Sequence, residues 1–444
     1  MKRYLIETWG CQMNVHDSEK MAGLLQRQGY APAGSADEAD LILLNTCSVR
    51  EKAAAKVFSR LGQLRLLKHR RENLVIGVCG CVAQVEGETI FRRAPWVDVI
   101  MGPRNIADLG ELLETARRDG RSLSLARDDD PIVFPAGTAA RAAGAKAYVT
   151  VMEGCNKKCS FCIVPYTRGR EVYRPAAEIV AEVADLAAAG YREIELLGQN
   201  VNAWHHGEDD FAGLLHQVDR VAGVQRLRFT TSHPGHLTRP IMEAMRDLPS
   251  VCNHLHLPAQ SGSDEVLHRM RRGYTREKYL SRIAFLRRSI PGMSLGTDLI
   301  VGFPGETEEE FALTLALVRE VEFDQVYAFA YSPRPGTPAA SAGDPIPEDE
   351  KADRLQRLLA LQGSIQSARN TGLLGRTFEV LADGPSPLDA SMSRGRTRCN
   401  RIVHFPAKSS TSGGFLEVRI TRAHAHSLTG EPAGNARVHV RFVR

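Results

Sequence analysis

The sequence predicts an α/β multidomain protein with an N-terminal parallel α/β domain, a central partial (β/α)6 barrel and a C-terminal small β-barrel. Short apolar runs alternate with helical stretches up to about residue 115 and again after residue 148, which predicts the first two domains. After Gly375, strand-like runs follow one another with no helix between them, which predicts the third. A chain of 444 residues is long enough for two or three domains, each with its own core.

Composition and charge narrow the class of protein. Hydrophobic residues make up 43% of the chain and charged residues 25%, as in ordinary globular proteins. No apolar run approaches the ~18 residues of a membrane span, and Met1-Lys2-Arg3 leads directly into a strand-like run. We therefore expect a cytoplasmic protein with no membrane association. Nine cysteines, several in short motifs, indicate ligand thiols in a reducing compartment rather than a disulfide framework.

Positive charge is concentrated at the end of the chain. From Thr371 to Arg444 there are 11 Lys and Arg against 5 Asp and Glu, whereas the preceding residues carry 46 against 47. A basic segment on an otherwise balanced protein is typical of a polyanion binder, although a solvated surface with no partner would have the same composition.

The first segment, residues 2–117, reads as alternating strands and helices. The expected strands cover residues 4–8, 41–44, 74–78 and 97–101, and the clearest helical patterns cover residues 18–27 and 50–69. This alternation predicts a parallel sheet. Residues 118–140, which are rich in Asp, Pro, Ala and Gly, are expected to form a linker.

Three cysteines occupy equivalent places in this first segment. Cys11 follows the first expected strand, Cys47 the second and Cys81 the third. The carboxyl ends of parallel strands share one edge of a sheet, so these thiols should converge there. Three converging thiolates could hold a metal cluster, or the residues could be small buried hydrophobes. Cys79 lies at the end of its strand and should point elsewhere, although it could take the place of Cys81.

The central segment, residues 141–373, contains six expected strand–helix units. The strands cover residues 148–153, 193–198, 225–231, 253–257, 294–301 and 325–331, and the helices cover residues 176–189, 210–221, 239–247, 275–289 and 307–320. Six such units predict an open partial barrel whose site is formed by the loops after the strands.

A compact group of three cysteines follows the first barrel strand. Cys155, Cys159 and Cys162 have C-x3-C-x2-C spacing. Structural zinc and iron–sulfur clusters usually take four cysteines, and no fourth lies nearby. A 4Fe–4S cluster held by three thiolates would leave one iron open for chemistry. A zinc knuckle completed by a distant residue is the alternative.

The spacing, with Phe161 beside the last cysteine, resembles the radical S-adenosylmethionine enzymes, whose open iron chelates that cofactor. The flanking Met152-Glu153-Gly154 and Ile163-Val164-Pro165-Tyr166-Thr167-Arg168-Gly169 resemble the methylthiotransferase branch more specifically. The residues around Cys11, Cys47 and Cys81 also resemble this family: Thr8-Trp9-Gly10-Cys11-Gln12-Met13-Asn14, Asn45-Thr46-Cys47-Ser48-Val49-Arg50 and Gly80-Cys81-Val82-Ala83-Gln84. The resemblance implies that these three cysteines bind an auxiliary 4Fe–4S cluster that takes part in sulfur delivery.

The resemblance also implies a binding site for the cofactor in the loops after the barrel strands. Gly198, Gln199 and Asn200 follow the second strand, where the family binds the amino group of S-adenosylmethionine. Gln260 and Ser261 follow the fourth strand. The loops that contain Thr231-Ser232-His233-Pro234 and residues 298–307 are further candidates for cofactor or substrate contacts. Each loop could instead be only a turn with a helix cap.

The sequence pattern indicates the roles of two histidines and one cysteine in the barrel less strongly. His254 and His256 alternate along one expected strand and so share a face, which favours packing or substrate contact over metal binding. Cys252 has no partner in the sequence pattern and is expected to be buried.

The last segment, residues 374–438, is expected to form a small β-barrel. Its expected strands cover residues 377–381, 401–405, 416–420 and 438–442. The stretch 395–401 before a strand and the stretch 427–431 in the last loop resemble the TRAM domain, an RNA-binding module. Cys399 stands where that domain usually has Asn or a similar polar residue, which leaves the local RNA contact open.

Together the resemblances imply a tRNA methylthiotransferase. The Gly10-Cys11-Gln12-Met13-Asn14 form resembles members that convert N6-isopentenyladenosine at position 37, in the anticodon stem-loop, into its 2-methylthio derivative. An unactivated aromatic C–H bond at C2 cannot be opened by acid–base catalysis at neutral pH, so the reaction needs a radical. The implied cofactors are two 4Fe–4S clusters and S-adenosylmethionine, which serves as radical source and methyl donor.

The expected partners, besides tRNA, are a one-electron donor such as flavodoxin and an iron–sulfur carrier, and we expect a monomer. Three alternatives remain at this point: a sibling enzyme that acts on threonylcarbamoyladenosine 37, a non-catalytic iron–sulfur protein that binds RNA, and a zinc protein.

Overall fold

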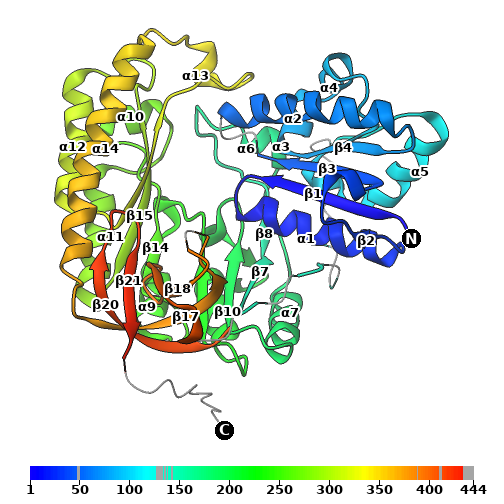
Figure 1. Cartoon of the computed structure of the whole chain (residues 1–444). Helices are drawn as coiled ribbons and strands as arrows, with labels where there is room; N and C mark the ends of the chain where they lie inside the picture. The colour runs from blue at the N-terminus through cyan, green and yellow to red at the C-terminus, as the bar shows by residue number, and fades with distance from the viewer. Residues whose placement is uncertain are drawn as a thin grey trace.

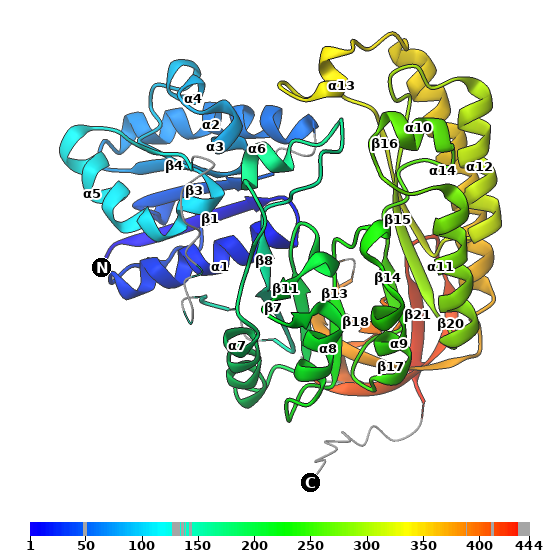
Figure 2. The same ribbon diagram turned by 180° about the vertical axis from the view of Figure 1, so that it is seen from behind.

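The computed structural model describes residues 1–47, 51–126, 134, 137, 139–141, 144–387, 389–409 and 413–433. Figures 1 and 2 show the N-terminal domain beside the central domain. The C-terminal barrel packs against the central domain at the bottom of both views. Residues 127–133, 135, 136 and 138 of the expected linker, and the strand expected at residues 438–442, lie outside the described residues.

The N-terminal domain is built on a parallel sheet with strand order β2-β1-β3-β4-β5-β6. Its strands are β1 (Arg3–Trp9), β2 (Ala31–Pro32), β3 (Leu41–Thr46), β4 (Val75–Gly80), β5 (Val99–Met101) and β6 (Ser122–Ser124). The four expected strands are confirmed. The additional strands β2 and β6 lie at the two edges and have only two and three residues, which is too short for a recognisable apolar run.

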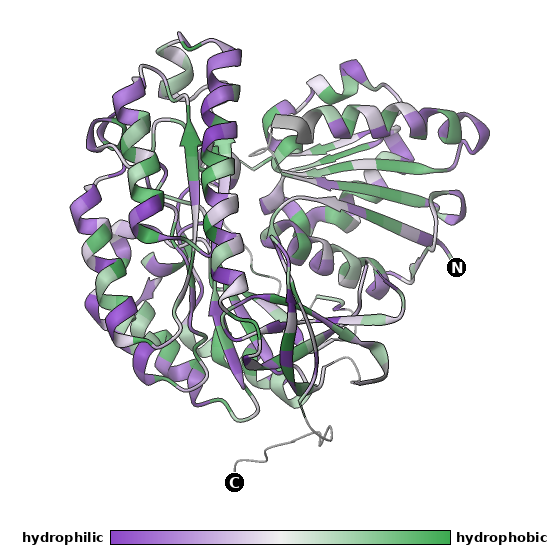
Figure 3. Ribbon diagram, turned by 60° about the vertical axis from the view of Figure 1, so that its left-hand side comes forward, coloured by the Kyte–Doolittle hydropathy of each residue, from purple (hydrophilic) through white to green (hydrophobic). Residues whose placement is uncertain are grey.

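Helices cover both faces of this sheet. They are α1 (Gln12–Arg27), α2 (Glu51–Arg70), α3 (Cys81–Glu86), α4 (Thr89–Arg93) and α5 (Leu109–Asp119). One apolar core lies between the sheet and helices α1 and α5, and a second lies between the sheet and helices α2, α3 and α4. The strands are therefore buried on both sides and read as continuous apolar runs, as the colouring of Figure 3 illustrates.

The central domain is an open half-barrel of six parallel strands. The strands form two groups, β13-β10-β7 and β14-β15-β16, which are joined by a bridge between Leu227 and Val251. The strands are β7 (Lys146–Thr150), β10 (Glu193–Leu197), β13 (Arg226–Phe229), β14 (His254–His256), β15 (Ser294–Val301) and β16 (Gln325–Ala330). The partial barrel predicted from the alternation of strands and helices is confirmed.

Helices on the outside of the half-barrel bury one face of each strand. They are α7 (Ala176–Ala188), α8 (Phe211–Asp219), α9 (Arg239–Asp247), α11 (Arg276–Ser289), α12 (Glu308–Val321) and α14 (Glu348–Thr371). The shorter elements are β8 (Met152–Glu153), α6 (Val164–Arg168), β9 (Val172–Tyr173), β11 (His205–His206), β12 (Asp209–Asp210), α10 (Asp264–Arg269) and α13 (Pro338–Ser341). Within the described residues no helix has both the length and the apolar character needed to cross a membrane.

The other face of the strands points into the half-barrel, because successive side chains of a strand alternate between faces. At the amino ends of β7, β10 and β13 this inner face is charged. Glu193 forms an ion pair with Arg228 at 3.0 Å, and Lys146 forms an ion pair with Glu195. The pKa of Glu193 is lowered, because Arg228, Lys146 and Arg226 outweigh the effect of burial, which alone would raise it.

The C-terminal domain is a closed barrel with strand order β17-β18-β19-β21-β20. Its strands are β17 (Thr377–Pro385), β18 (Met392–Thr397), β19 (Ile402–Pro406), β20 (Phe415–Ala423) and β21 (Leu428–Pro432). The prediction of a loop at residues 427–431 was wrong, because most of this stretch is strand β21. Residues 395–401 precede β19 as expected, although residues 395–397 themselves belong to the additional strand β18. Both missed strands have few apolar side chains, and they form because pairing with β17, β19 and β20 closes the barrel.

The C-terminal barrel is attached to the amino end of the half-barrel by two arginines. Arg226 donates to the carbonyl oxygens of Arg396 at 2.7 Å and Glu379 at 3.0 Å, and to the Glu379 carboxylate at 3.0 Å. Arg228 donates to the carbonyl oxygens of Thr397 and Arg398 at 2.8 and 3.0 Å. These contacts place β17 and the turn after β18 across the amino ends of the central strands.

We expect the substitution Arg226→Met to loosen this attachment. Removing one partner of a buried ion pair leaves the other groups desolvated without compensation, which costs about 3 kcal/mol. Chemical denaturation should show a lower free energy of unfolding, and limited proteolysis should cut faster between α14 and β17. Unchanged proteolysis and unfolding would contradict this account of the interface.

Candidate active site: two cysteine triads

The first triad lies in an irregular loop between β8 and α6. Cys159 is buried, whereas Cys155 and Cys162 are half-buried. Gly154, with a φ of +83°, starts the loop, and a Cβ at this position would overlap the carbonyl oxygen of Arg170. The backbone N–H of Cys155 donates to the Gly169 carbonyl at 3.0 Å. Only glycine permits this close turn, which brings Cys155 back toward the end of α6.

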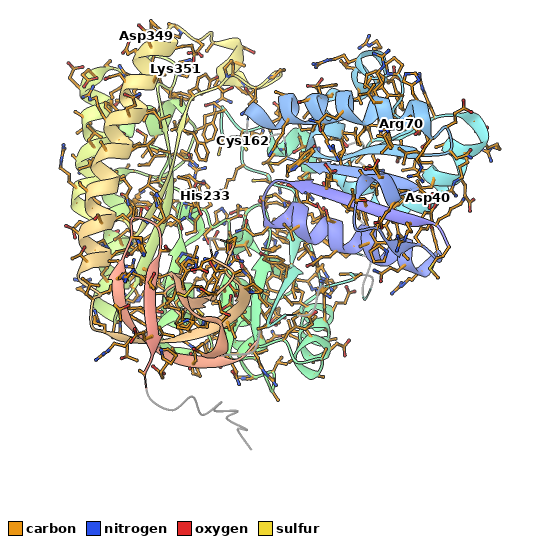
Figure 4. The ribbon with its side chains drawn as sticks, viewed as in Figure 1. Asp40, Arg70, Cys162, His233, Asp349 and Lys351 are labelled. Atoms are coloured by element: carbon orange, nitrogen blue, oxygen red, sulfur yellow. The ribbon has the colours of Figure 1, made fainter. Side chains whose placement is uncertain are left out.

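Hydrogen bonds and aromatic packing fix the other side of the loop. Ser160 donates through its backbone to Met270 O at 3.1 Å and through its hydroxyl to Arg269 O at 2.8 Å. Phe161 packs edge-on against Phe303, with ring centroids 6.4 Å apart. Cys162 lies on the side of the central domain that faces the N-terminal domain (Figure 4).

Burial favours the protonated form of two of these thiols, Cys155 and Cys162, in the absence of a positively charged ligand. Burial raises the pKa of Cys155 to about 11 and that of Cys162 to about 12. Arg272 donates to the sulfur of Cys159 at 3.3 Å. Binding of a metal cluster would displace the protons, since thiolates are the ligand form.

The loops predicted to bind the cofactor surround this triad. Gln199 accepts from the backbone N–H of Gly154 at 2.5 Å, so the loop after β10 touches the cysteine loop directly. Gly198 packs so closely on Met152 that a Cβ would come within 2.5 Å of the Met152 side chain. The side-chain amide of Asn200 donates to Glu171 at 3.0 Å, and its Oδ1 is buried without a hydrogen-bond partner in the described structure.

Further buried polar atoms with no hydrogen-bond partner among the described residues lie in the neighbouring loops. They are Ser232 Oγ, His233 Nε2 and Gln260 Oε1. Because buried polar groups are normally paired, such a set in adjacent loops marks a site for a polar ligand. The residues present therefore fit S-adenosylmethionine, which carries amino, carboxylate, ribose and base groups.

Two of the predicted cofactor residues, Gln260 and Ser261, differ in whether their side chains are free to bind a ligand. Gln260 is held at a φ of +68°, an unusual conformation for a residue other than glycine, and keeps a free side-chain oxygen. Ser261 instead shares a hydrogen bond with Thr314 at 3.3 Å and accepts from the Ser263 backbone at 3.1 Å. Its hydroxyl is thus already engaged in holding the loop.

In the sequence, His233 is distinguished only as one residue of a candidate loop. Its Nδ1 accepts from the Gly235 backbone at 3.0 Å, which leaves Nε2 as a donor. Burial, reinforced by the charge of Arg272, lowers the pKa of His233 to about 2, so the ring is a neutral donor. Figure 4 shows it in the interior of the central domain.

The second triad lies at the carboxyl ends of β1, β3 and β4. Cys11 caps the amino end of α1, Cys47 follows β3, and Cys81 is the first residue of α3. Cys11 and Cys47 share a hydrogen bond, and Cys81 lies close enough to influence the charge of Cys11. The structure thus brings the three cysteines together as predicted, whereas their role as cluster ligands stays a prediction.

Cys79 points away from this triad. It is buried in the apolar core between the sheet and helices α1 and α5, and burial raises its pKa to about 12. A thiol in that position is a small hydrophobe, so the geometry favours Cys81 as the third member. Cys252 is buried as expected.

Arg168 from the central domain adds positive charge to the second triad. The hydrogen bond with Cys47, together with the charge of Arg168, lowers the pKa of Cys11 to about 6. Burial raises the pKa of Cys81, and Arg168 partly offsets this effect. Within the described residues, no three His, Cys, Asp or Glu side chains lie close enough to bind a single shared metal ion. A cubane cluster instead distributes its thiolates over several irons.

The inner face of β14, β15 and β16 forms the remaining wall. His256 lies 3.1 Å from the Asp298 carboxylate and contacts the Tyr327 ring, with centroids 5.7 Å apart. Tyr327 and Phe329 are 44% and 41% exposed, although they lie on a strand whose opposite face is core. His254 instead contacts Asn400 of the C-terminal barrel at 3.4 Å.

Three family descriptions match successive parts of the chain. Residues 3–102 match the uncharacterized protein family UPF0004, residues 149–318 the radical SAM superfamily and residues 373–433 the TRAM domain. The radical SAM superfamily uses S-adenosylmethionine and a 4Fe–4S cluster.

Curated relatives cover almost the whole chain. A protein from Bordetella pertussis is 48% identical over 436 residues, which is 97% of this chain and 98% of the relative, and is named tRNA-2-methylthio-N(6)-dimethylallyladenosine synthase. This chain belongs to that family. Members from Chromobacterium violaceum and Geobacter metallireducens, with the same name, are 48% and 46% identical over the same 97% of this chain and 98% of their own lengths.

Solved structures share the fold of this synthase family member at low identity. The radical S-adenosylmethionine methyltransferase TsrM from Kitasatospora setae superposes with a TM-score of 0.55 at 14% identity, over 76% of this chain and 77% of that chain. The cobalamin-dependent enzyme OxsB gives a TM-score of 0.53 at 12% identity, over 80% of this chain and 56% of that chain. At these identities only the architecture is shared.

We expect Cys81→Ala and Cys79→Ala to separate ligation from packing. After anaerobic reconstitution, the Cys81 variant should lose about half of the bound iron and sulfide, because one of two three-thiolate sites is broken. The Cys79 variant should keep its iron and lose about 1 kcal/mol of unfolding free energy through a small cavity. Loss of iron from the Cys79 variant alone would reverse the assignment.

Proposed function

We propose that this chain adds a methylthio group to C2 of N6-isopentenyladenosine at position 37 of tRNA. Support comes from relatives of that name, which match 97% of the chain, and from one structural observation. Two cysteine triads lie at the carboxyl ends of two parallel sheets, and Arg168 connects them across the domain boundary. A reaction that opens a C–H bond and delivers sulfur at the same carbon would use two such centres in adjoining domains.

We propose that Cys155, Cys159 and Cys162 hold the radical 4Fe–4S cluster, and that Cys11, Cys47 and Cys81 hold an auxiliary cluster. When bound, these groups and S-adenosylmethionine supply the radical, the sulfur and the methyl group. The chain contributes position and environment. Arg272 donates to the Cys159 sulfur and so holds that side chain in place. The unpaired oxygens of Asn200 and Gln260 are available to accept from S-adenosylmethionine, and the neutral His233 to donate to it.

The substrate base is proposed to enter the half-barrel along β16. A base in an anticodon loop can leave its stack cheaply, and exposed aromatic rings offer it a new stacking surface. Tyr327 and Phe329 are such rings on the inner face, and the His256–Asp298 pair adds polar groups beside them. The apolar edges of the same rings suit a dimethylallyl substituent.

The C-terminal barrel is proposed to hold the tRNA backbone. Its exposed Arg419 and Arg422 on β20 provide positive charge away from the half-barrel. Such contacts supply phosphate affinity rather than sequence recognition. We further propose a cytoplasmic monomer that receives electrons from a donor such as flavodoxin and clusters from an iron–sulfur carrier.

Mass spectrometry of nucleosides from total tRNA tests the reaction. A strain without this gene should lose 2-methylthio-isopentenyladenosine and accumulate isopentenyladenosine. Wild-type protein should restore the modification, whereas Cys159→Ala should not, although it should bind an isopentenylated anticodon stem-loop as the parent does. Loss of the methylthio group from the threonylcarbamoyl derivative instead would assign the sibling reaction.

Single substitutions Tyr327→Ala and Phe329→Ala test the base-binding wall. Stacking on one aromatic ring contributes about 1–3 kcal/mol, so each variant should raise the KM for the stem-loop about tenfold. Cleavage of S-adenosylmethionine without RNA should stay unchanged. Leu359→Ala, at a residue equally exposed but on the outer helix α14, is the matched control. Unchanged KM values for both aromatic variants would place the base elsewhere.

A further inference from the structure

Arg168 is a buried cation at the boundary between the two triads. It is the last residue of α6, which follows Cys162 almost directly, and its side chain is 3% exposed. Its Nη2 crosses the domain boundary and donates to Asp17 Oδ2 on α1 at 2.6 Å. A second close contact lies beside it, because a Cβ on Gly169 would overlap the Arg104 guanidinium of the N-terminal domain.

The guanidinium also lies near the N-terminal triad. Its helix α6 packs on α3, whose first residue is Cys81, and its positive charge lowers the pKa of Cys11 and opposes the rise that burial causes in the pKa of Cys81. A guanidinium keeps its charge at any physiological pH, so its effect on neighbouring sulfur does not depend on titration. Arg168 thus lies on the helix that follows the first triad, and its charge acts on the cysteines of the second triad.

Nearby charges balance Arg168 without using all of its donors. Lys20 lies 3.8 Å from Asp17 and 3.7 Å from Glu153, and Arg168 Nη1 lies 3.7 Å from Glu153. Glu153 stands two residues before Cys155, so both ends of the first cysteine loop meet in this network. Arg168 Nη1 is buried and donates no hydrogen bond within the described structure. A buried donor of this kind fits an acceptor with negative charge.

We propose that Arg168 is a positioning residue that stabilises the added electron of the auxiliary cluster and holds that cluster toward the radical triad. The inference rests on the proposed second cluster at Cys11, Cys47 and Cys81. The reduction potential of an iron–sulfur cluster depends on local net charge, hydrogen bonds to sulfur and burial, and Arg168 supplies a buried positive charge beside the triad. Removing a nearby positive charge should therefore make reduction harder.

The test uses full-length protein with Cys155, Cys159 and Cys162 all changed to Ala, so that only the auxiliary cluster remains. In this parent, Arg168→Met, Arg168→Lys and Asp17→Asn are compared by redox titration monitored by electron paramagnetic resonance. We expect a more negative midpoint for the Met variant, a midpoint near that of the parent for the Lys variant, and a more positive midpoint for Asp17→Asn. Opposite signs on the two sides of one ion pair are specific to a charge effect.

Arg226→Met is the matched control, because Arg226 is equally buried and forms an ion pair with Glu379 across the other domain boundary. Its midpoint should equal that of the parent. Equal midpoints for Arg168→Met and the parent, or an equal shift in the Arg226 control, would overturn the proposal. If Arg168→Met loses its iron while Arg168→Lys and the Arg226 control keep theirs, the positioning role is supported; loss of iron in the control as well overturns it.

The parent protein is measured first, because its iron content tests the auxiliary cluster separately from the role of Arg168. A parent that binds no iron after reconstitution refutes the proposed auxiliary cluster and with it the role of Arg168. A parent that binds iron but whose midpoint does not respond to Arg168 refutes only the role of this residue.

Discussion

The buried ion pair between Asp17 on α1 and Arg168 on α6 joins the N-terminal sheet to the half-barrel beside both cysteine triads. Burying a carboxylate and a guanidinium costs several kcal/mol per ion, which is recovered only with good geometry and additional partners. Lys20 and Glu153 provide those partners. A purely apolar contact could join two domains as firmly, but it would place no charge beside the thiols.

A similar arrangement joins the other end of the half-barrel to the C-terminal domain. There, Arg226 and Arg228 donate to backbone carbonyls, and the carboxylates of Glu193 and Glu379 balance their charge. Hydrogen bonds to the backbone make this interface tolerant of the side chains on the turn after β18. Cys399, which departs from the usual polar residue of this domain, is buried there and shares a hydrogen bond with Thr397.

The local sequence pattern predicts most of the fold and where the cysteines lie in it. Apolar runs on buried parallel strands predict the sheets, and the rule that such strands end at one edge predicts the convergence of Cys11, Cys47 and Cys81. The sequence could not predict contacts made between domains. In the sequence, Arg168 is one basic residue in a short helix. Its importance comes from the hydrogen bond that it donates to Asp17, 151 residues away. The apolar pattern could not predict strands β18 and β21, because they form by pairing with neighbouring strands in the closed barrel.

The docking of the C-terminal barrel has a consequence for how ligands can reach the first cysteine triad. Because β17 and the turn after β18 lie across the amino ends of β10 and β13, that end of the half-barrel is covered by protein. The edge strands β7 and β16 are not paired with each other, so the half-barrel stays open along its side. Small molecules and a large polymer could therefore approach the cysteines from different directions.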